Sequence, residues 1–189
     1  MDEEKLVATL KSGDPAAIDT LVEAFGNRLL RSAILLCGNE TSAQDLVQDT
    51  FLETLRSIHR FRGQSGLYTW LHSILLNLTR RERRDGQRLV YDNDLAAQET
   101  SVAEERPSTL DSTRATTELT HALQQLSAPH REVLILRYYE HMKIHELAQH
   151  LGVSTGTVKS RLHYAIREMQ KLLPAEMNLF GANGTKEMA

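Results

Sequence analysis

The chain has few of the residues that cross-link a polypeptide or interrupt its helices. A single cysteine, Cys37, excludes an internal disulfide and any cysteine-based zinc finger. Cys37 lies on an apolar helical stripe, so we expect a buried core thiol. Ten glycines, four prolines and a 5% share of aromatic residues are few for 189 residues, and this scarcity favours helices over sheets. Apolar residues make up 41% of the chain, which is enough for one ordinary domain or two small ones.

The sequence also lacks the segments and motifs that mark membrane proteins and enzymes. No apolar run reaches about 18 residues, so we expect no membrane contact. The first residues, MDEEKLVATL, are acidic and have neither the basic nor the apolar region of a signal peptide, which predicts a cytoplasmic protein. There is no glycine-rich phosphate loop, no His-Glu-x-x-His and no serine or cysteine in a recognisable nucleophile context. We therefore expect no enzymatic activity and no cofactor.

Neither sign of charge dominates, because 22 basic and 25 acidic residues leave a net charge of −3 at pH 7. The acidic residues are concentrated in residues 89–117, which hold six acidic and two basic side chains. Apolar periodicity fades there, so we predict a flexible acidic linker between two helical domains. The linker could run through a basic channel of a partner, or it could be a plain solvated tether. Since its flanks carry little net positive charge, we expect weak unaided affinity for DNA.

The segment from Ile144 to Lys171 predicts two short helices joined by a tight turn. Apolar residues recur at i, i+3, i+4 and i+7 from Ile144 to Leu151, as on one face of a helix. Gly152 follows where a helix end needs left-handed backbone, and Ser154 can cap the next helix. The apolar stripe of the second helix consists of Val158, Leu162, Ala165, Ile166 and Met169. We predict a helix-turn-helix, although an αα-hairpin in a helical bundle would give the same pattern.

The other face of this second helix carries hydroxyls and cations. Its residues are Thr155, Thr157, Lys159, Ser160, Arg161 and His163. These side chains lie in the N-terminal part of a helix whose apolar face would pack on the domain core. Such an arrangement fits the DNA major groove. The hydroxyls at the helix start also suit a phosphate. We predict duplex DNA binding by this face, although part of it could be plain solvated surface.

Helix boundaries can also be recognised in the first half of the chain. Asp14-Pro15 predicts a helix start and Gly38-Asn39 predicts the end of that helix. Thr41 or Ser42 is expected to open the next helix, and a third is predicted from about Leu67 to Arg84. One face of the middle helix is acidic and rich in amides, which indicates either a solvated surface or a docking surface for a basic partner.

The third helix is predicted to have a buried side and an arginine-rich end. Its buried side comprises Leu67, Trp70, Leu71, Ile74, Leu75 and Leu78, and we place Tyr68, His72 and Asn77 elsewhere. Cations at a helix C-terminus are favourable for the helix dipole alone. Four arginines within positions 80–84 exceed that need, and the same helix carries tyrosine, tryptophan and asparagine. We therefore predict a surface for a nucleic-acid backbone and unstacked bases.

These segments resemble one known family. DLVQDTFLETL and FRGQSGLYTWLHSILLNLTRRERR are similar to region 2 of bacterial RNA polymerase sigma factors of the extracytoplasmic-function group. LQQLSAPHREVLILRYYE and IHELAQHLGVSTGTVKSRLHYA are similar to their region 4. The two blocks occur in the family's order and cover roughly residues 3–173. The resemblance implies a dissociable subunit that binds the β and β′ subunits of core RNA polymerase, recognises promoter DNA and promotes its opening.

The resemblance also assigns roles to individual residues. Contact with the β′ clamp helices is implied for Asp45, Leu46, Gln48, Asp49, Thr50 and Phe51. Capture of the −10 element is implied for Phe61, Arg62, Tyr68, Trp70, Asn77, Arg80, Arg81 and Arg84. In this set Asn77 corresponds to a position that reads a flipped base, the arginines would hold phosphates, and Trp70 could equally be core packing. Contact with the −35 element is implied for Thr155, Thr157, Lys159, Ser160, Arg161 and His163.

The expected domains are a region 2 domain (1–88), the linker (89–117), a region 4 domain (118–175) and a disordered tail (176–189). Many members of the family are held inactive by an anti-sigma factor, and the sequence leaves open whether this chain has one. A homodimeric operator-binding regulator is the main alternative, since it would use the same helix-turn-helix. His141 and His145 have a spacing that two metal ligands on a helix can use, but no cysteine is near, and we expect no metal.

Overall fold

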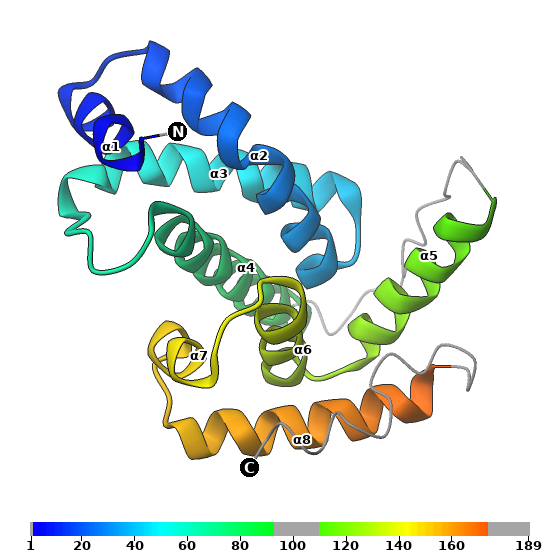
Figure 1. Ribbon diagram of the computed structural model, residues 1–189. Helices are drawn as coiled ribbons and strands as arrows, with labels where there is room; N and C mark the ends of the chain where they lie inside the picture. The colour runs from blue at the N-terminus through cyan, green and yellow to red at the C-terminus, as the bar shows by residue number, and fades with distance from the viewer. Residues whose placement is uncertain (1, 93–109, 174–189) are drawn as a thin grey trace. The chain divides into compact units, whose positions relative to one another are not determined.

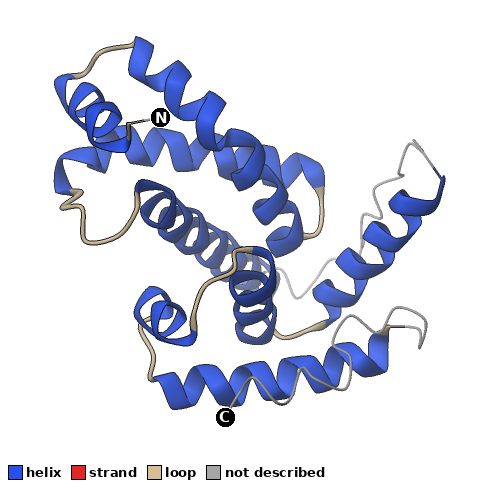
Figure 2. Ribbon diagram, viewed as in Figure 1, coloured by secondary structure: helices blue, strands red, loops and turns tan. Residues whose placement is uncertain are grey.

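The structure is a computed structural model that describes residues 2–92 and 110–173, with side chains for 2–85 and 116–173. Every regular element in these ranges is helical (Figures 1 and 2). The chain divides into two compact units, residues 1–104 and 105–189. The predicted all-α class with two helical domains is confirmed.

The first unit is built from long helices that share one apolar interior. Its elements are α1 (Glu3–Ser12), α2 (Ala16–Cys37), α3 (Glu40–Ser57), the 3₁₀ turn η1 (Ile58–Arg60) and α4 (Leu67–Asp92). α2, α3 and α4 pack against one another, while α1 packs against α2 and η1 (Figure 1). The interior is filled by side chains with almost no exposure, including Leu21, Leu29, Leu36, Ile58, Leu67, Leu71 and Leu75. Removing this apolar surface from water stabilises the helices, which have little stability alone.

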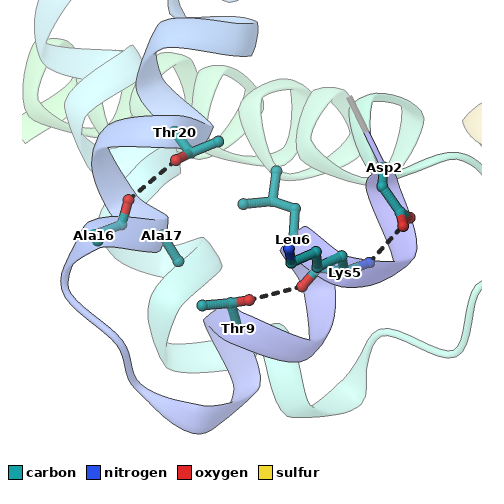
Figure 3. A pocket seen from close by; sticks show the side chains of 7 residues that line it. All are labelled: Asp2, Lys5, Leu6, Thr9, Ala16, Ala17 and Thr20. Atoms are coloured by element: carbon teal, nitrogen blue, oxygen red, sulfur yellow. Dashed lines mark hydrogen bonds between the residues drawn. The ribbon is translucent and has the colours of Figure 1, made fainter.

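Polar side chains set the ends of α1 and α2. Asp2 caps α1 by accepting the Lys5 backbone N–H at 3.2 Å (Figure 3). The Asp14 carboxylate accepts the Ala16 backbone N–H at 2.9 Å, but the N-cap of α2 is Pro15 and not Asp14 as predicted. α2 begins at Ala16, one residue later than predicted. Between the two helices lies a pocket lined by Asp2, Lys5, Leu6, Thr9, Ala16, Ala17 and Thr20.

The junction of α2 and α3 differs in detail from its prediction. Gly38 has left-handed backbone (φ 91°) and ends α2 as predicted. The next cap is Asn39, whose Oδ1 accepts the Ser42 N–H at 2.7 Å, so the prediction that Thr41 or Ser42 opens α3 was wrong. Asn39 can serve both as the residue after one helix and as the cap of the next. Cys37 is half-buried instead of fully buried, and its thiol donates to the Asn39 carbonyl at 3.3 Å.

The second unit surrounds a smaller interior. Its elements are α5 (Leu110–Gln125), α6 (Ala128–Leu134), the π-helical segment η2 (Ile135–Tyr139), α7 (Ile144–Leu151) and α8 (Thr155–Leu172). α8 packs against α6 and α7. Deeply buried side chains of this interior include Val133, Leu136, Leu147, Val158, Leu162 and Met169. Since α8 supplies half of these side chains, its orientation is fixed by the core of this unit.

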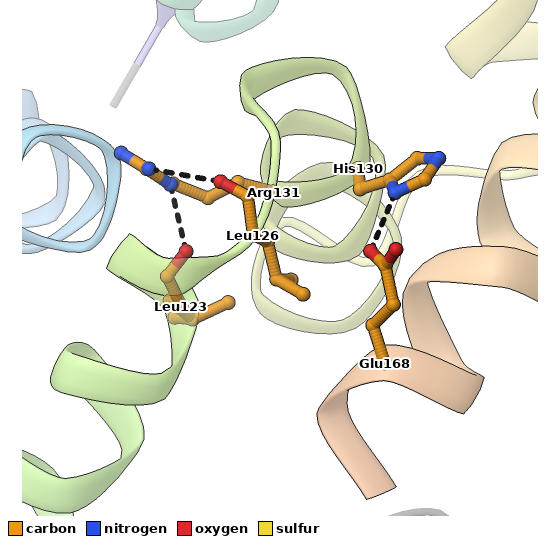
Figure 4. Close-up of polar contacts among 5 residues, drawn as sticks. All are labelled: Leu123, Leu126, His130, Arg131 and Glu168. Atoms are coloured by element: carbon orange, nitrogen blue, oxygen red, sulfur yellow. Dashed lines mark hydrogen bonds and ion pairs between the residues drawn. The ribbon is translucent and has the colours of Figure 1, made fainter. Parts of the chain in front are cut away.

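Two side chains of α6 fasten its neighbours (Figure 4). Arg131 donates to the carbonyl oxygens of Leu123 at 2.9 Å and Leu126 at 3.2 Å, at the C-terminal end of α5. The last carbonyls of a helix have no partner within the helix, and a cation there is favourable. His130 Nδ1 lies 2.7 Å from Glu168 Oε2 and connects α6 to α8. Residue 131 therefore holds α5 and residue 130 holds α8.

The described helices extend into the predicted linker from both sides. α4 continues to Asp92 and α5 begins at Leu110, so the predicted linker 89–117 contains helical residues at both ends. The rest of it, 93–109, lies outside the described residues, as does the predicted tail 176–189. Among the helices that the structure describes, none has the length and apolar character needed to cross a membrane.

Candidate nucleic-acid interfaces

The predicted helix-turn-helix is confirmed in its local geometry. Gly152 ends α7 with φ 67° and ψ 35°, and its N–H bonds back to carbonyls of the helix. Ser154 Oγ accepts the Thr157 N–H at 3.1 Å and caps α8. Left-handed backbone at a glycine and a capping serine two residues later leave a short turn, so α8 starts immediately after α7.

The predicted DNA-binding side chains of α8 all reach the surface. Thr155, Lys159, Ser160 and His163 are exposed, while Thr157 and Arg161 are half-buried. The opposite side of α8 lies in the core, so this face is directed away from the unit. Two cations, a histidine and three hydroxyls therefore stand together on a rigid helix and can reach phosphates and base edges.

Tyr164 adds an exposed aromatic ring beside this face. Its side chain is 54% exposed, and its ring stacks on His130 with a centroid distance of 6.4 Å and an angle of 18° between the planes. His163 meets the edge of the same ring at 5.5 Å. His130 therefore contacts two residues of α8, Glu168 through its Nδ1 and the exposed Tyr164 through its ring.

One face of α4 carries an amide and three arginines. Asn77, Arg80, Arg81 and Arg84 have the spacing i, i+3, i+4 and i+7, which places them on one side of a helix. Arg80 is half-buried and the other three are exposed. Arg81 Nε lies 3.7 Å from Asp85 Oδ2, a surface ion pair of little energetic worth that a phosphate can replace. The amide can read a base edge while the cations hold the adjacent backbone.

The loop before α4 contains both supporting and exposed residues. Phe61 is only 8% exposed, and its ring lies 5.3 Å from that of Trp70, which is half-buried. Arg62 is exposed at the beginning of the loop. Phe61 was assigned to DNA contact, but it is buried and therefore supports the loop from inside the unit. Arg62 and part of Trp70 are accessible to a ligand.

Tyr68 and His72 are buried, so placing them away from the buried side of the helix was wrong. Tyr68 is 8% exposed and its ring lies 5.8 Å from that of Phe25. The guanidinium carbon of Arg28 stands 3.8 Å from the centroid of the Tyr68 ring, a cation–π contact. α4 packs against α2 as well as α3, so its buried arc is wider than a single apolar stripe. Tyr68 thus connects α4 to α2 and does not form part of an open surface.

His72 forms a buried polar contact that the sequence did not reveal. Its Nε2 lies 2.8 Å from Ser32 Oγ, and both side chains are fully buried. Burial, with a smaller contribution from the positive charge of Arg28, lowers the pKa of His72 to about 4. A neutral histidine and a hydroxyl therefore join α4 to α2 in the interior of the unit.

The predicted polymerase-binding residues of α3 divide into a surface set and a core set. Asp45, Gln48 and Asp49 are exposed and have the spacing i, i+3 and i+4. The core set has exposures of 5%, 0% and 9% and consists of Leu46, Thr50 and Phe51. The Thr50 hydroxyl is also used internally, since it donates to the Leu46 carbonyl at 2.7 Å. The core set therefore holds the helix in place, and the surface set is what a partner can touch.

Leu52 extends the exposed face of α3 and was missed by the sequence reasoning. It follows Asp45 at i+7, and its side chain is 44% exposed. A large apolar side chain within an acidic face is a feature of protein-binding surfaces. A single leucine has no periodic pattern of its own, so only its exposure distinguishes it from the buried Leu46 of the same helix.

Two family models match the chain in the two units. The model described as Sigma-70 region 2 matches residues 21–89, and the model described as Sigma-70, region 4 matches residues 122–171. The first match contains α3 and the described part of α4 that bears Asn77 and the arginines. The second contains the helix-turn-helix.

Relatives cover most of the chain. The ECF RNA polymerase sigma factor SigL of Mycobacterium tuberculosis is 31% identical over 88% of this chain and 94% of its own length. The chain belongs to the extracytoplasmic-function sigma factors of the sigma-70 family. The RNA polymerase sigma-H factor of Pseudomonas aeruginosa is 29% identical to this sigma factor over 90% of the chain and 93% of its own length.

Two solved structures have similar folds. RpoE of Bartonella quintana, solved in complex with the anti-sigma factor NepR, shares 29% identity and a TM-score of 0.67, covering 82% of this chain and 94% of its own. CnrH, solved in complex with the cytosolic domain of CnrY, shares 26% identity and a TM-score of 0.65, covering 90% and 96%.

As a sigma factor, the chain recognises promoters together with RNA polymerase, and it is not an enzyme. The match to region 2 sets aside the alternative of a homodimeric operator-binding regulator, because such a regulator needs only the helix-turn-helix. Both predictions, of the family and of its function, are confirmed.

Proposed function

We propose that α3 of this sigma factor binds core polymerase, that α4 and its preceding loop bind the −10 element, and that α8 binds the −35 element. The observation that carries the proposal is the face of α4 on which Asn77 stands beside Arg80, Arg81 and Arg84. An unpaired base with its backbone requires an amide and cations on one side.

The polymerase-binding face consists of Asp45, Gln48, Asp49 and Leu52. Its two carboxylates suit a basic surface such as the β′ clamp helices that the family resemblance implies. Leu52 supplies apolar area beside the charged residues of this face, and burial of such a side chain contributes to affinity. Leu46, Thr50 and Phe51 contribute indirectly, by fixing α3 in the core.

Capture of the −10 element combines a base reader with backbone contacts. Asn77 offers a donor and an acceptor to the edge of one flipped base, and three arginines along the same face hold the phosphates beside it. Arg62 in the loop adds a further cation. Trp70 is half-buried, so its accessible edge can stack on a base while the rest of the ring packs on Phe61.

Recognition of the −35 element falls to the start of α8. Lys159, Arg161 and His163 can contact phosphates or guanine edges, and Ser160 can contact either kind of partner. Thr155 and Thr157 lie at the N-terminal end of the helix, where backbone N–H groups and hydroxyls favour a phosphate.

Opening of the promoter requires no bond chemistry from the protein. Free energy from binding the unpaired −10 strand offsets the cost of unstacking and unpairing the duplex. Both units belong to one chain, so engagement of the −35 element raises the effective concentration of the first unit at the −10 element. The net charge of −3 explains why a polymerase-bound state is needed, since the free chain attracts DNA only weakly.

The regulation and location of this sigma factor are proposed by similarity. Two of its neighbours of known structure were solved with the anti-sigma factor NepR and with the cytosolic domain of CnrY. We infer that an anti-sigma factor also binds this chain and that the chain acts in the cytoplasm, where polymerase and promoters are found.

The test is transcription by core RNA polymerase and this sigma factor on a promoter library, with every start site mapped. Asn77→Ala should change the preferred base at one −10 position, because it removes the amide that reads the base. Arg161→Ala should weaken promoter binding and lower the salt dependence by about one counterion. Asn27→Ala and Arg31→Ala make the same substitutions at exposed sites of α2 and should change neither property. Promoter profiles unchanged in both test variants would refute the residue assignments.

A further inference from the structure

Helix α1 contacts both ends of the loop that leads into α4. Lys11 Nζ donates to the Phe61 carbonyl oxygen at 2.9 Å, at the beginning of the loop. The Glu3 carboxylate accepts the backbone N–H of Leu67, at its end. Phe61 is 50 residues from Lys11 in the sequence, and Leu67 is 64 residues from Glu3. The region 2 family model begins at residue 21, so its match does not include α1.

The contact with Glu3 supplies a cap that α4 cannot provide itself. The Gly66 carbonyl accepts the Trp70 N–H at 3.1 Å, which places Gly66 at the N-cap position, just before the first helical residue Leu67. Glycine has no side chain to accept the free N–H groups of the first turn. The Glu3 carboxylate takes that place, and its negative charge is favourable at a helix N-terminus. The N-terminal end of α4 is therefore capped by a side chain of α1.

The contact with Lys11 fixes the other end of the loop. The Phe61 ring is packed against Trp70, and its carbonyl is held by the ammonium group of Lys11. Leu6 and Leu10 are buried and keep α1 in position against the rest of the unit. Between the two held ends, residues 62–66 are exposed. Lys11 and Glu3 belong to the same helix and bond to the two ends of the loop. Together they therefore fix the position of the loop that carries Arg62.

We infer that α1 is a positioning element for −10 recognition, with Glu3 and Lys11 as its positioning residues. They hold the loop so that Arg62 and the Asn77 face meet the same unpaired strand. This inference rests on the proposed role of Arg62 and Asn77. Removing either contact with α1 leaves the strand-binding side chains present but no longer in register. A lost charge-assisted hydrogen bond corresponds to about a tenfold loss of affinity for the strand.

The experiment measures holoenzyme, assembled from core polymerase and the full chain, with a single-stranded oligonucleotide pool randomised at the −10 positions. Glu3→Ala and Lys11→Met are the test variants, and Lys11→Arg keeps a donor for the Phe61 carbonyl. Glu4→Ala and Lys5→Met are matched controls, because both residues are exposed on the same helix. Affinity for core polymerase and the thermal midpoint of the free sigma factor are measured in parallel.

We expect E3A and K11M to weaken strand binding about tenfold and to blur base selection in the pool, with core affinity within about twofold of the original. K11R should restore strand binding, and E4A and K5M should match the original chain. Equal losses of strand binding and core affinity would overturn the inference, because they would show a purely structural role.

The variants Arg62→Ala and Asn77→Ala separate this inference from the proposal beneath it. If these two weaken strand binding while E3A and K11M do not, the positioning role of α1 is refuted and the −10 site stands. If R62A and N77A also bind like the original chain, the −10 site itself is refuted, and the positioning role falls with it.

Discussion

His72 Nε2 and Ser32 Oγ lie 2.8 Å apart in the interior of the first unit, where neither side chain is exposed. Burial and the charge of Arg28 lower the pKa of His72 to about 4, so this histidine stays neutral near pH 7. The contact joins α2 to α4, the helix that also bears the proposed −10 site. A site that must hold an unpaired strand in register is thereby built on a helix with a fixed position.

Acid should destabilise the first unit through His72. Below its ordinary pKa of 6.5 the unfolded chain binds a proton that the native chain takes up only near pH 4. The free energy of unfolding therefore falls as the pH decreases from about 6.5 to 4, by roughly 3 kcal/mol from this residue, and the contribution levels off below pH 4. Urea unfolding at a series of pH values measures the change.

His72→Gln isolates this effect, because glutamine keeps a polar group but does not titrate. The variant should be less stable at pH 7, and its stability should vary less between pH 6.5 and 4. His59→Gln removes an exposed histidine and serves as the control. A pH dependence in H72Q equal to that of the original chain would show that other groups cause the acid sensitivity.

Leu52→Ser should weaken binding to core polymerase without unfolding the protein. The side chain is 44% exposed, so its replacement opens no cavity in the core. Loss of one apolar contact in an interface costs about 1–2 kcal/mol, which corresponds to roughly tenfold in affinity. Competition for core polymerase against the original sigma factor measures it. Val22→Ser changes an equally exposed residue of α2 and should bind as the original does.

Arg131→Met should destabilise the second unit. The guanidinium donates to the carbonyls of Leu123 and Leu126 and closes the end of α5, so its loss leaves these acceptors without their charged donor. We expect a decrease of about 2 kcal/mol in the free energy of unfolding of this unit. Arg167→Met removes an exposed arginine of α8, and denaturant titrations of the two variants should differ by most of that amount. Equal stability would mean that Arg131 does not hold α5.

The helix-turn-helix could be predicted because its determinants are local. Gly152 needs left-handed backbone and Ser154 caps the helix that follows it, so a few adjacent residues specify the turn. The row of Asn77 and the arginines was similarly visible as helical spacing. Both features depend on neighbours within about seven residues, and a sequence records such neighbours directly.

The features that the sequence did not reveal depend on distant partners. Tyr68 and His72 are buried because α2 covers a second side of α4, and periodicity along α4 alone contains no trace of α2. Glu3 caps a helix that begins 64 residues later, and no spacing rule connects the two. For Leu52 it was exposure, and not burial, that the sequence did not reveal. An exposed leucine and a buried leucine look the same in a sequence until the packing of α3 is known.

Permanganate footprinting of a promoter bound by holoenzyme tests most directly whether the Asn77 face holds the melted −10 strand. The original chain should make thymines of the −10 segment reactive. The combined variant N77A/R80A/R81A/R84A should still occupy the −35 element and bind core polymerase but leave those thymines protected. Unchanged reactivity in the combined variant would contradict the proposed −10 site.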